Sequence, residues 1–277
     1  MSTSATVTQD RTVTSSDGST IAYDLSGSGP VVVLVAPALA DRSDHRRLAA
    51  LLSRDHTVIN YDRRGRGRST EASPWSPGRE VEDLAALIAA HGGSASLFGA
   101  SSGAVLALDA ANSLAGMVER VVAFEAPVIV DDGRPPVPRE LSRQLDQLVR
   151  EERRGQAVTR FMRDALEAPA AMVLAMRMMV PAWRQMTAMA HTTVYDVELC
   201  AGLQDGGPIS GDRWKAISVP VLALVGQKSK PWAHAGTKAV AAATGGRAVT
   251  VSGAHHGTPT MQPQAIVPHL REFLREG

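Results

Sequence analysis

The sequence predicts an α/β fold, with a doubly wound, mostly parallel sheet of eight strands and an inserted helical cap. Short β-rich or apolar runs recur along the chain, most of them are followed by helical spacing, and one long helical stretch interrupts this alternation. Alternating β and α segments with short links are typical of a parallel sheet covered by helices on both faces. The 277 residues, 44% hydrophobic with a formal net charge of +1, suit one such domain and favour neither a nucleic-acid nor a membrane partner.

The strands follow from local composition. Segments 11–14 and 20–24 are β-rich and flank the turn 16–19, which predicts a hairpin. Val31–Val35 is apolar at every position, which indicates a strand buried on both faces in the middle of the sheet. The remaining short runs are expected to form strands at 56–61, 96–98, 118–124, 219–225 and 247–251.

Helices are expected after these strands. Segment 80–90 has helical spacing, with Val81, Leu84 and Leu87 on one face. The other helical segments lie directly after a strand or close to one, and they are expected at 103–114, 232–243 and 264–275.

The alternation is interrupted at 131–214. Segments 139–153 and 155–167 are amphipathic, and a Met-rich stretch follows Pro169. We interpret 131–214 as a helical cap over the carboxyl edge of the sheet, where ligands of such sheets bind, and 1–130 with 215–277 as the core.

Cysteine usage and the N-terminus indicate a cytoplasmic protein. Cys200 is the single cysteine, so no internal disulfide is possible. Segment 1–11 lacks the basic-then-apolar order of a signal peptide, and no apolar run reaches the about 18 residues that span a bilayer. No His, Asp and Cys cluster has ligand spacing, so no metal or cofactor is expected. The partner is expected to be a small-molecule substrate, and the chain a monomer or homodimer.

The strongest chemical motif is Gly99-Ala100-Ser101-Ser102-Gly103. It follows the strand expected at 96–98 and precedes the helix expected at 103–114, which is the strand–turn–helix placement of a nucleophile elbow. Small neighbours let strand and helix approach, and the serine lies at the helix N-terminus, where developing negative charge is favoured. The alternative is a Ser-rich helix cap with glycines used for packing. The context favours Ser101 as a nucleophile.

With this motif, the chain resembles the α/β-hydrolase superfamily over nearly its whole length. Segment 61–69 is similar to that family's Asp-x-Arg-Gly-x-Gly-x-Ser turn after the fourth strand. We interpret its four arginines as solvated side chains on a Gly-rich turn, because the near-neutral chain argues against a phosphate or nucleic-acid site.

The resemblance implies a histidine base on the loop after the last strand. Segment 249–257 occupies that place and is similar to the family's Gly-x-Gly-His loop. This similarity aligns His256 with the base, and His255, which replaces a glycine, is the fallback.

The acid departs from the family's common pattern. Ser229 stands where the family often has Asp, in the loop after the penultimate strand. Glu125, at the tip of the strand 118–124, resembles the orienting Glu of the haloalkane dehalogenase branch, so we assign it this role. The alternatives are a salt bridge from Glu125 to a cap arginine, or an acid from Asp131 or Asp132.

The oxyanion hole is expected to use two backbone N–H groups. One belongs to Ser102, the residue after the nucleophile. The other is assigned to Ala38 by alignment, because Ala36-Pro37 replaces the family's usual His-Gly and Pro37 has no N–H. The apolar residues predicted to bind substrate, of which the methionines could instead pack the cap core, are Leu39, Met162, Met176, Met179 and Trp183.

These assignments predict serine hydrolysis of an ester, lactone or thioester of a mid-sized apolar molecule. Because the oxyanion loop is altered, a cyclase, lyase or acyltransferase using the same site is the second hypothesis. A ligand-binding receptor on the same fold is the third, and the retained Ser101 and His256 count against it.

Overall fold

The structure is a computed structural model, and it describes residues 8–275. One eight-stranded sheet runs through it in the order β1-β2-β4-β3-β5-β6-β7-β8. The strands are β1 (Gln9–Thr14), β2 (Thr20–Ser26), β3 (Val31–Val35), β4 (Thr57–Tyr61), β5 (Ala95–Ala100), β6 (Val118–Phe124), β7 (Val221–Gly226) and β8 (Arg247–Val251). Strand β2 pairs antiparallel with β1 and β4, and every other pairing is parallel. The predicted fold class is confirmed.

Burial in the sheet explains its composition. Every residue of β5 and β7 is buried, and β3 is buried at all but its first position. Strands covered on both faces can be apolar throughout, because neither side chain direction meets water. The edge strand β1 is exposed at five of its six positions and carries polar residues.

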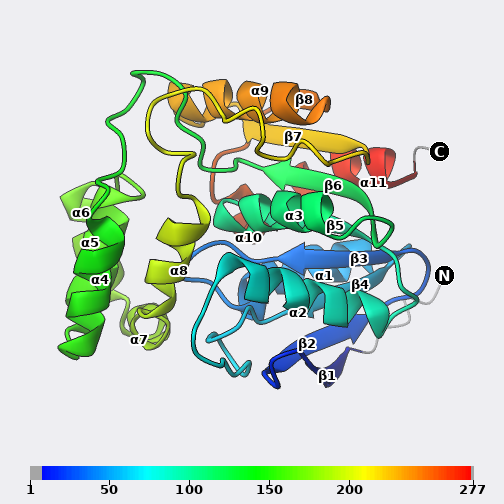
Figure 1. Cartoon of the computed structure of the whole chain (residues 1–277), viewed down its shortest axis with the longest axis horizontal. Coiled ribbons are helices and arrows are strands. Elements are labelled where there is room, and N and C mark those ends of the chain that lie inside the picture. The colour runs from blue at the N-terminus through cyan, green and yellow to red at the C-terminus, as the bar shows by residue number, and fades with distance from the viewer. Residues whose placement is uncertain (1–7, 276–277) are drawn as a thin grey trace.

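Helices cover both faces of this sheet (Figure 1). The outer helices are α1 (Arg46–Leu52), α2 (Pro77–Ala89), α3 (Ser102–Ser113), α9 (Pro231–Thr244), α10 (Thr258–Met261) and α11 (Val267–Arg275), with 3-10 turns at Arg42–His45 and Pro263–Ala265. Buried side chains of α2, α3 and α9 share one apolar cluster with the sheet, and those of α1 and α11 share a second. In place of the single helix predicted at 264–275, the chain forms the 3-10 turn Pro263–Ala265 and then α11. Pro263 and Pro268 are the first and second residues of these two pieces, and proline is accommodated only in the first turn of a helix.

Five helices lie between β6 and β7. They are α4 (Leu141–Arg150), α5 (Arg154–Asp164), α6 (Ala170–Met178), α7 (Val180–Ala188) and α8 (Thr192–Leu199). Figure 1 shows them beyond the end of the sheet toward which the arrows of β3 and β6 point. Their own apolar cluster includes Leu39 and Ile129, so this helical insertion packs on the loops that follow β3 and β6.

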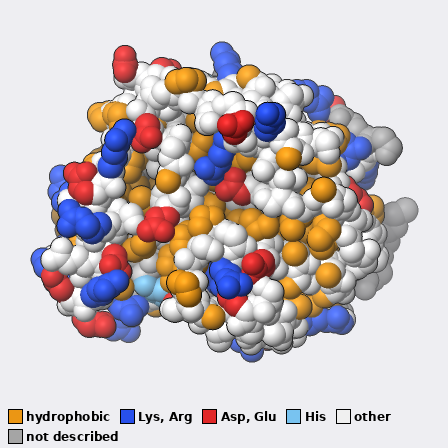
Figure 2. Space-filling model, viewed as in Figure 1, with side chains coloured by type: hydrophobic (Ala, Val, Ile, Leu, Met, Phe, Trp, Pro, Cys, Tyr) orange, Lys and Arg blue, Asp and Glu red, His pale blue; other side chains and the backbone are white. Residues whose placement is uncertain are grey.

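The surface carries both signs of charge. Figure 2 shows Lys and Arg side chains interspersed with Asp and Glu over the insertion. Within residues 8–275, no helix is long and apolar enough to cross a membrane.

Candidate active site

The predicted nucleophile occupies a sharp turn between β5 and α3. Ser101 has φ 54° and ψ −125°, a strained conformation for a residue with a side chain. A Cβ on Gly99 would lie 2.2 Å from the Gly103 carbonyl oxygen, and one on Gly103 would lie 2.4 Å from the Val35 carbonyl oxygen. Both glycines are therefore required by the close approach of strand and helix.

Glu125 and His256 meet across the edge of the sheet. Glu125 follows β6, has a left-handed φ of 47°, and accepts a hydrogen bond from His256 at 2.7 Å between Oε2 and Nδ1. Its other oxygen accepts from the Gly226 N–H at 2.8 Å and from the Ser229 hydroxyl at 2.5 Å. Burial opposes ionisation, but these bonds outweigh it, so the pKa of Glu125 lies below its ordinary value.

Ser229 therefore supports Glu125 in this arrangement. It occupies the position where the family often has Asp, and its hydroxyl donates to the carboxylate that contacts the histidine. The sequence contained a signal for this contact. Ser229, at the position where an acid is usual, and Glu125 both follow strands that end at the same edge of the sheet.

The loop after β8 distinguishes the two adjacent histidines. The His255 N–H donates to Thr258 Oγ1 at 2.8 Å, and His255 Nδ1 accepts from the Gly257 N–H at 3.1 Å. These bonds engage His255 within the loop, whereas the His256 ring contacts Glu125 and is 54% exposed. The Ser101 side chain makes no hydrogen bond to any residue in the range 8–275. Hydrogen bonds between catalytic groups are often long before substrate binds.

The loop after β3 presents a strained backbone beside the elbow. Leu39 has φ 56°, a left-handed conformation for a branched residue. Over the described range, neither the Ala38 N–H nor the Ser102 N–H is bonded to another group. Two unbonded N–H groups next to Ser101 are what an oxyanion hole requires.

The arginines that follow β4 differ from the prediction. Arg63, Arg64 and Arg66 are at most 1% exposed, whereas Arg68 has a side chain 61% exposed. The expectation of solvated side chains is wrong for the first three and confirmed for Arg68.

Each buried arginine has a carboxylate partner distant in the sequence. Arg63 pairs with Glu80 at 2.7 Å and with Asp196 at 2.8 Å. Arg64 pairs with Asp83 at 2.7 Å. Charges this deeply buried require such pairing, because an unpaired one loses its hydration without compensation.

A small cavity adjoins Ser101 and Ser102. Its volume of about 20 Å³ is room for one water molecule. Apolar side chains dominate its walls, and the residues other than the two serines are Ala38, Pro127, Phe161, Ala165, Leu166, Asp196, Val197, Cys200 and Gln204.

Most of these lining residues were not predicted to bind substrate. The spacing of Phe161 and Ala165 puts them on one face of a helix, which was readable from the sequence. That this face of α5 lies over the serine is decided by packing of the insertion, and no local pattern encodes it.

The residues predicted to bind substrate do not line this cavity. Leu39 and Met162 are buried in the apolar cluster of the insertion, and Met176 packs at its margin. Met179 is 56% exposed. Trp183 packs against the same cluster and lines a separate outer groove.

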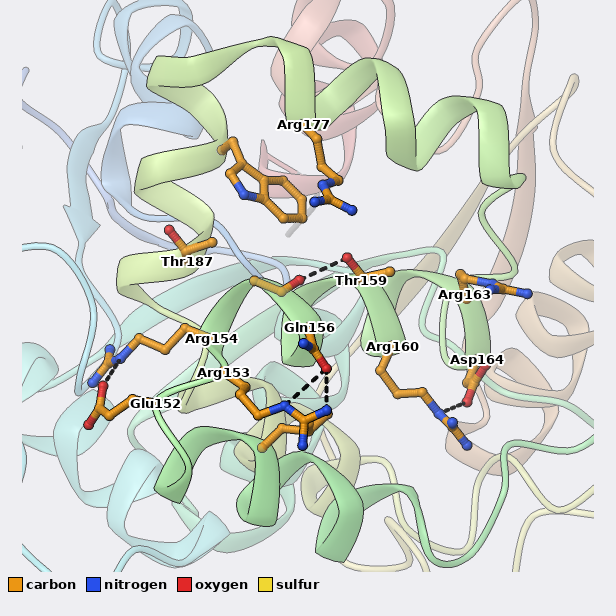
Figure 3. Close-up of a pocket in the computed structure, with 13 residues that line it drawn as sticks. Glu152, Arg153, Arg154, Gln156, Thr159, Arg160, Arg163, Asp164, Arg177 and Thr187 are labelled. Carbon is orange, nitrogen blue, oxygen red and sulfur yellow. Dashed lines mark hydrogen bonds and ion pairs between the residues drawn. The ribbon is translucent and has the colours of Figure 1, made fainter.

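Figure 3 shows that outer groove, which is lined by Gln156, Thr159 and Arg160 of α5 and by Arg177 and Thr187, with Thr159 on the side of α5 toward Arg177. Its volume is about 930 Å³, and the Arg177 guanidinium lies 5.8 Å from the Trp183 ring centre. Phe161, on the buried face of α5, lines the Ser101 cavity instead. The groove is thus on the other side of α5 from Ser101.

A model of the alpha/beta hydrolase family matches residues 25–269. The chain belongs to the alpha/beta hydrolase family. The matched range includes the elbow, Glu125 and His256.

Solved structures agree with this assignment. An alpha/beta hydrolase from Sphaerobacter thermophilus is 44% identical to the chain, with a TM-score of 0.87, and the match covers 95% of this chain and 100% of that one. Two structures at 21% identity share the fold: the enol-lactonase from Burkholderia xenovorans (TM-score 0.72, 94% and 98% covered) and the esterase RhEst1 from a Rhodococcus species (TM-score 0.65, 96% and 98% covered).

One curated relative matches over a shorter region. The uncharacterized hydrolase YraK from Bacillus subtilis is 39% identical over 97 residues, which make up 33% of this chain and 35% of that protein. The match therefore spans about a third of that relative. Within residues 8–275 of this alpha/beta hydrolase, no group of three or more His, Cys, Asp or Glu side chains could hold a metal ion.

Proposed function

We propose that this alpha/beta hydrolase is a serine hydrolase that cleaves an ester, lactone or thioester of a mid-sized apolar molecule. Ser101 is the nucleophile, His256 the general base and Glu125 its orienting acid. The Ala38 and Ser102 N–H groups bind the oxyanion. The observation that carries the proposal is the 2.7 Å contact between His256 Nδ1 and Glu125, at the sheet edge where the elbow holds Ser101 at φ 54°.

Acylation begins when Ser101 Oγ attacks the carbonyl carbon and His256 Nε2 takes the hydroxyl proton. The carbonyl electron pair moves to oxygen, and the two N–H groups stabilise the negative charge. Glu125 stabilises the imidazolium, which then returns the proton to the departing alcohol or thiol.

Deacylation repeats the same steps with water. His256 removes a proton from a water molecule, which attacks the acyl-serine carbonyl through a second oxyanion. The acid departs and the Ser101 hydroxyl is restored.

The walls of the cavity support an apolar substrate. Phe161, Leu166 and Val197 surround the space beside Ser101. Since about 20 Å³ holds only one water molecule, a larger substrate requires α5 and α8 side chains to move apart.

A second candidate is a cyclase, lyase or acyltransferase that uses the same serine. The Ala36-Pro37 pair in the oxyanion loop favours it, because the family's usual His-Gly is absent.

We place the protein in the cytoplasm, since its lone Cys200 is a buried free thiol without a disulfide partner.

A substrate panel tests the proposal directly. Wild-type protein is expected to hydrolyse p-nitrophenyl esters, with kcat/KM rising with acyl chain length because the cavity walls are apolar. Release of p-nitrophenol measures the rate, with heat-unfolded protein as the blank. Inertness toward all these esters and toward simple lactones and thioesters would favour the cyclase, lyase, acyltransferase or receptor alternatives.

Ser229→Ala tests the support of the acid. Loss of the hydroxyl removes one bond to Glu125, so we expect kcat/KM to fall about 10-fold, or about 1.4 kcal/mol, near the lower end for a hydrogen bond to a charged group. Because that bond favours the carboxylate, its removal raises the pKa of Glu125, so the loss of activity that accompanies protonation of Glu125 in acid should begin at a higher pH than in wild type.

Ser229→Thr is the matched control, because threonine retains a hydroxyl. It should keep the acid limb of the wild-type profile. A Ser229→Ala profile identical to wild type would show that this bond does not support Glu125 during turnover.

A further inference from the structure

A buried charged cluster lies between the helical insertion and the elbow. Asp196 on α8 accepts hydrogen bonds from Arg63 Nη1 at 2.8 Å and, through both its oxygens, from Arg66 Nη2 at 2.8 and 2.9 Å. All three side chains are at most 2% exposed. The insertion thus contributes a buried carboxylate beside the candidate site, since Asp196 lines the same cavity as Ser101 and Ser102.

The same arginines hold the loop that carries Ala38. Arg66 Nη1 donates to the Pro37 carbonyl at 2.6 Å and to the Ala40 carbonyl at 3.2 Å. Arg63 Nη1 donates to the Ala36 carbonyl at 3.3 Å. Carbonyls on both sides of Ala38 are therefore fixed, which leaves the Ala38 N–H defined in position and unbonded.

Asp196 also holds the residue that provides the other N–H. The Ser102 hydroxyl donates to Asp196 Oδ1 at 2.8 Å and accepts from Arg63 Nη1 at 3.3 Å. One carboxylate from the insertion is consequently linked to both residues whose N–H groups flank Ser101.

The charges in this cluster balance only when Asp196 is present. Arg63 and Arg66 face Glu80 and Asp196, so two positive groups meet two negative ones. Burial opposes ionisation of Asp196, but the two guanidinium groups and the Ser102 hydroxyl keep its pKa below the ordinary value. Arg66 Nε has no hydrogen-bond partner in the described range, so Asp196 and two loop carbonyls alone orient that guanidinium.

We propose that Asp196 is a positioning residue that, through Arg63, Arg66 and Ser102, sets the separation of the two N–H groups of the oxyanion hole. The inference rests on the proposed serine hydrolase function. It assigns the helical insertion a part in stabilising the transition state, beyond covering the site. It also explains how a loop with Ala36-Pro37 in place of the family's usual His-Gly is held in a strained conformation.

The test compares Asp196→Asn with Asp83→Asn. Asp83 is an equally buried carboxylate whose partner, Arg64, adjoins Arg63, but the Asp83–Arg64 pair contacts neither the Ala38 loop nor Ser102. Both variants lose a buried ion pair and should show a similar fall in Tm. Only Asp196→Asn is expected to lower kcat on p-nitrophenyl butyrate, by about 100-fold with KM changed less than about 3-fold, because loss of one oxyanion donor costs about 100- to 1000-fold.

A second readout does not depend on turnover. The rate at which a fluorophosphonate labels Ser101 should fall in parallel with kcat, because its phosphoryl oxygen uses the same donors and fluoride leaves as the Ser101–phosphorus bond forms. Should Asp196→Asn fail to fold, Ser102→Ala keeps the Asp196 carboxylate and removes the hydroxyl bonds of Ser102 to Asp196 and Arg63, and a loss of about 10-fold in the labelling rate is expected.

The outcomes separate the two claims. A folded Asp196→Asn, or failing that Ser102→Ala, that labels at the wild-type rate overturns the positioning role and leaves the serine hydrolase function intact. Equal losses of kcat in Asp83→Asn and Asp196→Asn would assign the effect to stability and overturn it as well. A wild-type protein that neither reacts with the fluorophosphonate nor hydrolyses the ester would reject the proposed function, and this inference with it.

Discussion

Replacing Ser101 with alanine is expected to lower kcat by at least about 1000-fold and to abolish labelling by a fluorophosphonate. The hydroxyl is the only group removed, so the turn between β5 and α3, with the glycines that it requires, keeps its conformation. The residual rate would come from substrate binding and the oxyanion donors alone. In-gel fluorescence of the labelled protein and initial rates on p-nitrophenyl esters measure the two effects.

Ser113→Ala provides a matched control for the nucleophile. Ser113 is exposed at the far end of the same helix, α3, and its alanine variant should label and turn over like wild type. Labelling that persists in Ser101→Ala would place the nucleophile elsewhere and remove the elbow from its proposed role.

Glu125→Gln is expected to lower kcat by about 1000- to 10 000-fold while the protein stays folded. The amide is nearly isosteric and can still accept from the Gly226 N–H, so the loop geometry is retained. It no longer stabilises the imidazolium, and its NH2 group can favour the wrong tautomer of His256. Steady-state rates, with Tm as the folding check, measure the loss.

Two further variants sharpen this test. Asp132→Asn alters an exposed carboxylate beyond the tip of β6, and it should have no effect. In the double variant Glu125→Gln/Ser229→Asp, a carboxylate returns at the position that is 2.5 Å from Glu125 Oε1, and partial recovery of kcat is expected. A near-normal rate in Glu125→Gln alone would show that Glu125 is not the acid that orients His256, and the acid would then be unassigned.

The surroundings of Glu125 show which contacts the sequence predicted and which it did not. An apolar strand that ends in Glu125 and a loop that lacks its usual Asp predicted the pairing with His256, and the structure brings these side chains to 2.7 Å. The sequence placed Ser229 and Glu125 on loops at the same edge of the sheet, but the hydrogen bond between them was not predicted, because it depends on how the two loops approach one another after folding.

The sequence by itself determined the strands, their parallel arrangement and the elbow, because alternation, apolar runs and glycine spacing are local properties of the chain. Only the tertiary structure decided which arginines are buried. Arg63 meets Glu80 across 17 positions and Asp196 across 133, and no local pattern specifies such partners. The same holds for the cavity, whose walls come from loops and helices far apart in the chain. Burial of charge and the shape of a pocket are properties of packing, so they arise only when distant segments meet.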